Sequence, residues 1–182
     1  MLLRYEKDAM LVSRAPCRVR VSQQYTSIGR VLYVNRPMIR TYKYRLYPTN
    51  AQRRQLDFLL WQARSVYNAA LEQRIDVYRE TGKGVTYPQQ WAHFRDVRRE
   101  QSDTLGQLNA TSMQQLLRRL DKAFNAFFHR LKTGETPGFP RFKGRNHFNS
   151  LEYRHGNGCK VRFGDRVMLY IQNVGEIKVK YH

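Results

Sequence analysis

Three carboxylates in the middle of the chain have the spacing of a metal site or an acid–base pair. Glu72, Asp76 and Glu80 follow one another at intervals of four residues, which places them on one side of a helix. A catalytic metal needs several carboxylates that converge on the ion. Here Arg74 and Arg79 flank the row and no further ligand-type residues converge on it. The pattern therefore favours a solvent-exposed helix face with ion pairs between neighbouring turns.

The cysteines and histidines form a second candidate set. Cys17 and Cys159 are far apart and make no CxxC pair, whereas His147 and His155 precede Cys159 around the Gly-rich segment HGNGC. Zinc takes three or four ligands at close spacing, so the sequence disfavours a metal, and we expect free thiols in a reducing cytoplasm. No phosphate loop, dinucleotide pattern or nucleophile–base motif is present. The sequence predicts no cofactor and no catalytic centre.

The charge indicates a polyanionic partner. The 182 residues include 33 Lys and Arg against 14 Asp and Glu, a net charge of +19, together with 12 Tyr, 9 Phe and 2 Trp. Most of the basic residues are Arg, which binds phosphate and stacks on bases better than Lys. No apolar run approaches the roughly 20 residues of a membrane-spanning helix, and charged residues interrupt the apolar N-terminus. Nucleic acid is therefore favoured over a membrane.

The segment GFPRFKGRNHF has the composition of a nucleic-acid contact. Phe139 and Phe142 alternate with Arg141, Lys143 and Arg145, a pattern that suits stacking on bases while holding phosphates. For the two Phe residues, packing beneath a β-barrel is an equal alternative. For the three basic residues we favour phosphate contacts.

Several elements must position these residues. TYKYRLYP alternates from Thr41 to Pro48 and predicts a half-exposed strand with Lys43 and Arg45 on its outer face. A capping box over Thr49–Gln52 then opens a long amphipathic helix that ends at Gly82.

Two more helices follow. Pro88 marks a helix start in VTYPQQW. A second capping box, Ser112–Gln115, predicts the start of the third helix. Its apolar stripe runs from Met113 to Leu131 and is predicted to pack in the core, and Gly134 ends the helix.

The last fifty residues read as short strands separated by turns, which gives an α+β fold: a small β-barrel interrupted by a three-helix domain. We assign residues 38–48 to the first strand, 49–134 to the helices and 135–182 to the remaining strands. Residues 1–37 are interpreted as an N-terminal extension, with CRVRVSQQY as its candidate strand. One hypothesis is that the start was placed too early and that the working protein begins at Met38.

Six blocks resemble the N-terminal part of the TnpB/OrfB family, transposon-encoded RNA-guided DNA endonucleases described in older work as transposases with a helix-turn-helix. They are YKYRLYPTNAQ, VYNAALEQRIDVYRETGKG, TYPQ, LLRRLDKAFNAFF, GFPRFKGR and KVRFGDRVML with VGEIKVKYH, and they cover Met38 to His182. The resemblance implies a wedge-type β-barrel interrupted by a helix-turn-helix-like recognition domain. Family members begin near the position of Met38.

The resemblance also implies roles for residues. Tyr87 in TYPQ, and Thr111 and Gln114 at the start of the third helix, match positions that contact the DNA flanking the target. A Gln can pair with adenine through two hydrogen bonds; the alternative for Gln114 is a capping or solvent-facing role. Trp91, one turn after Tyr87, is equally a DNA contact or a core residue.

The expected partners are guide RNA and double-stranded DNA. Lys43, Arg45, Arg141, Lys143 and Arg145 resemble contacts to the guide-RNA backbone. The family continues into a RuvC-like nuclease domain, whereas this sequence ends at KVKYH. We therefore expect a nucleic-acid-binding module that is not itself an enzyme. The alternatives are half of a split nuclease completed in trans by a RuvC polypeptide, a DNA-only helix-turn-helix regulator, and a decayed remnant.

Overall fold

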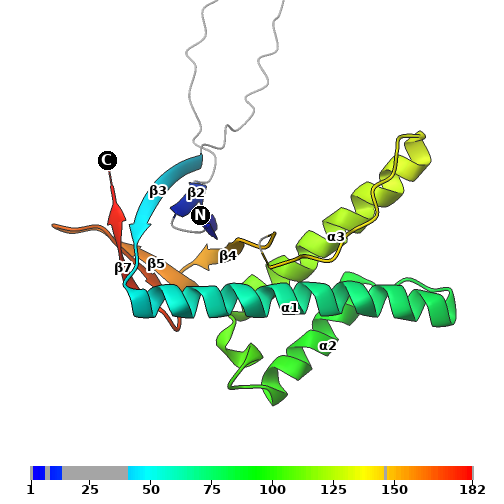
Figure 1. Cartoon of the computed structure of the whole chain (residues 1–182), viewed down its shortest axis with the longest axis horizontal. Helices are drawn as coiled ribbons and strands as arrows, with labels where there is room; N and C mark the ends of the chain where they lie inside the picture. Colours follow the sequence, from blue (N-terminus) through cyan, green and yellow to red (C-terminus); the bar gives the residue numbers. More distant parts are fainter. Residues whose placement is uncertain (1, 7–8, 14–40, 146, 182) are drawn as a thin grey trace, which may run out of the picture.

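A β-barrel and a three-helix insertion make up the computed structural model, which describes residues 2–6, 9–13, 41–145 and 147–181 (Figure 1). The barrel closes in the order β1-β2-β3-β7-β6-β5-β4. Neighbouring strands are antiparallel except β4 and β5, which pair in parallel over two residue pairs. The predicted α+β class, with a barrel interrupted by helices, is confirmed. The described strands are β1 Leu2–Glu6, β2 Ala9–Ser13, β3 Thr41–Tyr47, β4 Ser150–His155, β5 Gly158–Arg162, β6 Met168–Ile171 and β7 Gly175–Lys180.

The strands β1 and β2 lie within the segment that the sequence assigned to an extension, and they were not predicted. β1 pairs with β2 and with β4, and β2 pairs with β3, each over five positions. These two strands thus fill the space between β3 and β4 and complete the barrel. The predicted strand over residues 17–25 and the start at Met38 lie outside the described residues.

The barrel core follows the period-two pattern of its strands. In β7, Ile177 and Val179 are buried while Lys178 and Lys180 are exposed. Full burial of one such aliphatic side chain contributes about 1.5–3 kcal/mol. Among the side chains of the barrel strands whose burial is described, the buried apolar ones are Leu46, Leu151, Tyr153, Cys159, Leu169, Ile171, Ile177 and Val179.

The helices are α1 Asn50–Thr81, α2 Tyr87–Glu100 and α3 Ala110–Thr133, with a short 3-10 turn at Leu105–Gln107. Figure 1 shows α1 running from the barrel to the far end of the helical part. The predicted capping box of α1 is confirmed, because the Gln52 amide donates to Thr49 Oγ1 and the Thr49 amide donates to Gln52 Oε1. Gly82 ends the helix with a φ of 67°.

The predicted start of the third helix is wrong by one turn. Asn109, not Ser112, is the N-cap, and its Oδ1 accepts from the amides of Thr111 and Ser112. Asn caps a helix as well as Ser does, so both positions were chemically suitable. The Ser112 hydroxyl instead donates to the Glu152 carbonyl at 2.8 Å and ties α3 to β4.

The apolar stripe of α3 is buried only in its first half. Met113, Leu116, Leu117 and Leu120 are at most 1 % exposed. The core prediction is wrong further along, where Phe128 is 52 % and Leu131 51 % exposed. The barrel and α2 pack against the first half, whereas a loop that carries Phe139 lies beside the second half.

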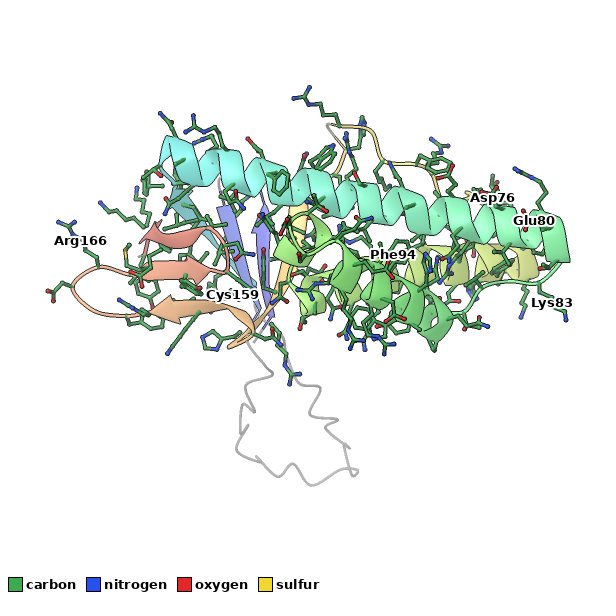
Figure 2. The ribbon with its side chains drawn as sticks, turned by 90° about the horizontal axis from the view of Figure 1, so that it is seen from below. Asp76, Glu80, Lys83, Phe94, Cys159 and Arg166 are labelled. Carbon is green, nitrogen blue, oxygen red and sulfur yellow. The ribbon has the colours of Figure 1, made fainter. Side chains whose placement is uncertain are left out.

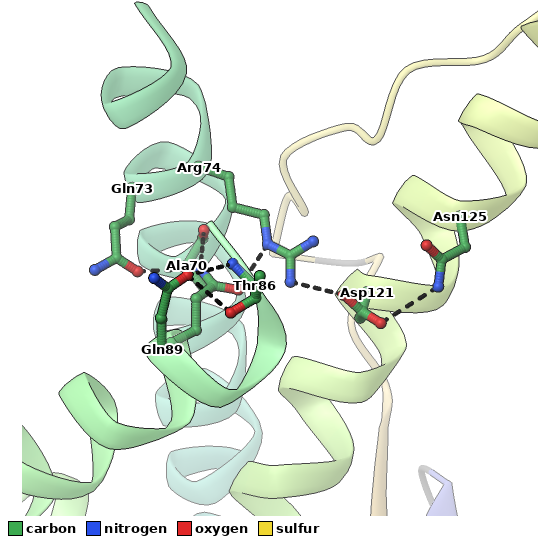
Figure 3. Close-up of polar contacts among 8 residues, drawn as sticks. Ala70, Gln73, Arg74, Thr86, Gln89, Asp121 and Asn125 are labelled. Atoms are coloured by element: carbon green, nitrogen blue, oxygen red, sulfur yellow. Dashed lines mark hydrogen bonds and ion pairs between the residues drawn. The ribbon is translucent and has the colours of Figure 1, made fainter. Parts of the chain in front are cut away.

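A polar hub on α1 holds the three helices together (Figure 3). Arg74 donates through Nε to Gln90 Oε1 of α2 at 2.7 Å, and through a terminal nitrogen to Asp121 Oδ1 of α3 at 3.0 Å. Gln90 in turn donates to the Ala70 carbonyl at 2.7 Å. Arg74 and Gln90 are buried, so this network fixes how α2 and α3 sit on α1.

Candidate nucleic-acid interface

The predicted DNA contacts of α2 stand at its beginning. Thr86 caps the helix and Tyr87 is its first residue, so Pro88 occupies the second helical position rather than the first. Tyr87 and Trp91 are one turn apart, partly buried, and both pack against the hydrophobic core. Trp91 therefore has the packing role that the sequence left open, and its part in DNA binding stays a prediction.

The predicted DNA contacts of α3 share one face with a residue that the sequence analysis missed. Thr111, Gln114 and Arg118 are spaced by three and four residues, which places them on one side of a helix. The Arg118 guanidinium carbon lies 5.5 Å from the centre of the Tyr87 ring. The structure thus brings the Tyr87 end of α2 to the α3 face that carries Gln114. A cation–π partner for Tyr87 could not have been found from spacing along one helix.

This α2–α3 face combines three chemistries that suit DNA. Gln114 offers an amide that can both donate and accept, Arg118 offers a cation, and Tyr87 offers a phenol at a helix start. Base edges are recognised by such amides, and phosphates by Arg. Arg74 donates to Gln90, which lies about one turn after Tyr87 on α2. This hydrogen bond therefore fixes the start of α2 relative to the other helices.

The outer face of the barrel carries the predicted RNA contacts Lys43 and Arg45, both exposed on β3. The register places Arg45 opposite Lys180, and Tyr47 opposite Lys178. Arg45 and Lys178 both lie over the Tyr47 ring, at 5.5 and 6.0 Å from its centre. Basic residues directly opposite each other disfavour pairing of the strands, and a bound polyanion would relieve this repulsion. The lysines of β7 were not predicted as contacts.

The loop that carries Arg141, Lys143 and Arg145, which we call the clamped loop, is held to α1 by hydrogen bonds. The Asn68 side chain accepts from the Lys143 amide at 2.8 Å and donates to the Lys143 carbonyl at 3.1 Å. This two-way bond fixes the backbone while Arg141 and Arg145 remain exposed. Lys143 is partly buried, and its Nζ lies 5.7 Å from the centre of the Tyr67 ring.

The two Phe residues of this loop do not lie beneath the barrel. Phe139 packs edge-on against Phe124 and Phe127 of α3, with ring centres 5.6 and 5.3 Å apart. It remains 48 % exposed, and Phe142 is 55 % exposed. The barrel-packing alternative is therefore wrong for both, since helix α3 is the aromatic partner of Phe139.

The acidic row of α1 lies apart from these surfaces. Figure 2 shows Asp76 and Glu80 toward the end of α1 that is remote from the barrel. Asp76 pairs with Arg79 at 3.1 Å, and both side chains are largely exposed. The predicted exposed ion pair is thus confirmed at this position.

The described residues hold no group of three His, Cys, Asp or Glu side chains placed for a metal ion. His155 is exposed while Cys159 is buried inside the barrel (Figure 2). Burial raises the pKa of the Cys159 thiol to about 12. Cys159 is therefore protonated near neutral pH and packs as an apolar side chain.

No helix in the described part of the chain has the length and apolarity that crossing a membrane requires.

Comparisons with known proteins show what the chain is similar to. Residues 38–83, which include β3 and α1, match the OrfB/IS605-type family model described as a "Helix-turn-helix domain". The chain is also 34 % identical over 107 residues to a protein of Streptomyces pristinaespiralis named "Putative RNA-guided DNA endonuclease". That similarity covers 58 % of this chain and 25 % of the relative, so the chain matches about a quarter of the relative's length. A helix-turn-helix is a nucleic-acid-binding motif. The predicted resemblance to the N-terminal part of the TnpB/OrfB family is thereby confirmed, by a helix-turn-helix family match over residues 38–83 and by the similarity to this relative.

Proposed function

We propose that this chain binds guide RNA and the duplex DNA that flanks its target, as a module without a nuclease centre of its own. The observation that carries the proposal is the α2–α3 face, where Tyr87 meets Arg118 beside Gln114. This face offers groups for both a base edge and a phosphate. The name of the Streptomyces relative, which couples RNA guidance to DNA, supports the same assignment.

The RNA is assigned to the barrel and the loop after α3. Lys43 and Arg45 on β3 extend into the basic outer side of β7, and Arg141 and Arg145 project from the clamped loop. Backbone contacts of this kind hold RNA by shape and charge rather than by sequence. The cell compartment proposed for this binding is the cytoplasm, where we expect the free, buried thiol of Cys159 to stay reduced.

Cutting of DNA is not assigned to this chain. In the acidic row of α1, Asp76 forms an ion pair with Arg79, and Asp76 and Glu80 lie toward the end of the helix that is remote from the barrel. A nuclease supplied by a separate RuvC polypeptide stays the second candidate. It predicts guide-dependent, Mg²⁺-dependent cleavage when that polypeptide is added to this chain.

The test begins with the full chain expressed in its native host, followed by sequencing of the RNA that co-purifies. Enrichment of RNA from the end of the transposon supports guide binding, and unenriched bulk RNA contradicts it. Binding to duplex DNA is then measured with and without that RNA. A requirement for RNA supports the proposal, whereas equal binding without RNA supports the DNA-only regulator.

The DNA contact is tested with Gln114→Ala, using Gln115→Ala on the next face of α3 as the matched control. Loss of a base-edge pair costs about 1–3 kcal/mol, so Gln114→Ala should weaken binding to the preferred flanking sequence by about 5- to 150-fold. Binding to other sequences should change little. Equal effects of the two substitutions on binding would show that Gln114 does not contact a base of the DNA.

A further inference from the structure

Two adjoining hollows lie where the clamped loop passes between α1 and the barrel. The first encloses about 540 Å³ and is lined by Trp61, Arg64 and Arg145, among others. The second encloses about 460 Å³ and is lined by Arg119, Lys143 and His147, among others. Phe148 and Asn149 line both hollows, so the two adjoin each other, and together we call them the depression. Each has the size that small ligands occupy.

We infer that this depression binds one unpaired nucleotide of a single strand, with its base stacked on Trp61 and its phosphates held by the surrounding cations. The inference rests on the proposed nucleic-acid binding and adds a site that reads an unpaired base. Neither the sequence pattern nor the family match assigned a role to Trp61.

The exposure and the ring contacts of Trp61 suit stacking on a nucleic-acid base. It is 50 % exposed, although its neighbours Leu60 and Gln62 on α1 are buried. Its ring stacks on that of Phe58, one turn earlier, with centres 5.9 Å apart and planes 29° apart. Phe58 thus holds one side of the indole, and the rest of the Trp61 side chain lines the first hollow and also a hollow beside α2. Stacking of one base on an aromatic ring contributes about 1–3 kcal/mol.

The cations of the second hollow are held by aromatic rings. Arg119 lies 5.4 Å from the centre of the Phe148 ring. The ring centres of Phe148 and Tyr67 are 5.9 Å apart, and the Lys143 Nζ lies over the Tyr67 ring. A ring steadies a cation without neutralising it, so the positive charge remains available for phosphate.

Acidic groups offset only part of this charge. Arg119 pairs with Glu152 at 3.2 Å. Among the described residues that line the two hollows, Asp57 is the acidic one, against Arg4, Arg64, Arg119, Lys143 and Arg145. This excess of positive charge favours an anionic ligand over a protein partner whose surface carries both acidic and basic groups.

A concave site with an aromatic wall selects an unpaired base. In a duplex the bases are stacked on one another, and an exposed indole inside a hollow reaches only a base that has left the stack. Because Asn68 fixes the Lys143 backbone from both sides, the loop edge of the site is preformed. The same chemistry suits an unpaired nucleotide of RNA or of a separated DNA strand.

The test uses the full chain and three fluorescent probes: oligo-U, oligo-dT and a blunt DNA duplex of equal charge. Trp61→Ala should weaken binding of at least one single strand by about 5–100-fold, with duplex binding changed less than twofold. Trp61→Phe should restore most of the affinity. The preferred single strand identifies RNA or DNA as the source of the nucleotide. Phe128→Ala, which removes a side chain of matching exposure, 52 %, from the far end of α3, is the control and should leave all three affinities unchanged.

Salt titrations separate stacking from charge. Trp61→Ala should leave the slope of log K against log salt unchanged, whereas Arg145→Gln should reduce its magnitude by about 0.7 on a single strand. In a Trp91→Phe background, the single strand should quench the fluorescence of Trp61. Equal loss on duplex and single strand, or no loss on either single strand, would overturn the inference while leaving nucleic-acid binding in place. Failure of the unaltered chain to bind any probe would overturn both.

Discussion

Replacing Arg74 should destabilise the helical part strongly, because this side chain joins all three helices. Arg74→Met keeps most of the apolar stem and removes the donors to Gln90 and Asp121. It also removes the cation 4.9 Å from the centre of the Phe124 ring. Only 8 % of the Arg74 side chain is exposed, so water cannot replace the bond to the buried Gln90.

The expected cost is about 2–4 kcal/mol. Removing one partner of a fully buried ion pair costs about 3–5 kcal/mol. Asp121 is 34 % exposed and also accepts from Asn125, so leaving Asp121 without its ion pair costs less than this. Leaving Gln90 Oε1 without this donor adds about 1–3 kcal/mol. Arg79→Met on the same helix is the matched control, because its pair with Asp76 has side chains 74 % and 46 % exposed. It should cost less than about 0.5 kcal/mol.

The assay is urea unfolding of the full chain, followed by circular dichroism at 222 nm. With a slope of about 2 kcal/mol per molar urea, Arg74→Met should lower the midpoint by about 1–2 M. Arg79→Met should leave it almost unchanged. If the two substitutions shifted the midpoint equally, the hub would not be what fixes α2 and α3 on α1.

Three further predictions concern the core and the joints of the fold. Leu120→Ala should cost about 2–5 kcal/mol of unfolding free energy, because Leu120 is fully buried, whereas Leu131→Ala at 51 % exposure should cost less than about 1 kcal/mol; equal costs in urea unfolding would contradict the boundary of the core. Gly158→Ala should cost more than about 2 kcal/mol, since φ is +78° and a Cβ there would overlap the Asn109 side chain, while Gly156→Ala, with a φ of +83° and open space, should cost about 1–2 kcal/mol; thermal unfolding of the pair distinguishes overlap from backbone strain. Burial raises the pKa of Cys159 from 9.0 to about 12, so the folded state keeps a proton that the unfolded state releases. The unfolding free energy should therefore fall between pH 9 and pH 12 more steeply in the unaltered chain than in Cys159→Ala, and parallel curves would show that burial does not perturb this thiol.

Local signals along the sequence predicted the helices well. The capping box at Thr49 and the glycines after α1 and α3 mark helix ends that depend on a few neighbouring residues. The start of α3 was misplaced because two capping residues compete there, and the bond from Ser112 to the Glu152 carbonyl depends on a strand forty residues away.

The barrel that β3 forms with the later strands was predicted, but other contacts between segments far apart in the sequence were not. β1 and β2 belong to the barrel because they pair with β4 and β3, which lie far along the chain. The exposure of Phe128 depends on which elements cover α3, and periodicity alone carries no such information. The candidate site divides in the same way: the loop cations and Gln114 follow from composition and motif, whereas Arg118 and Trp61 stand out only once the helices and the loop are assembled.

The basic surfaces of this chain are expected to bind nucleic acid through its phosphates, and the salt dependence of binding measures this contribution. Affinity of the full chain for a 20-bp DNA duplex should be measured from 50 to 300 mM salt. If about six phosphates are neutralised, log K should fall against log salt with a slope near −5. A slope near zero would show that the net charge of +19 takes no part in binding and that the phosphates are not what the chain recognises.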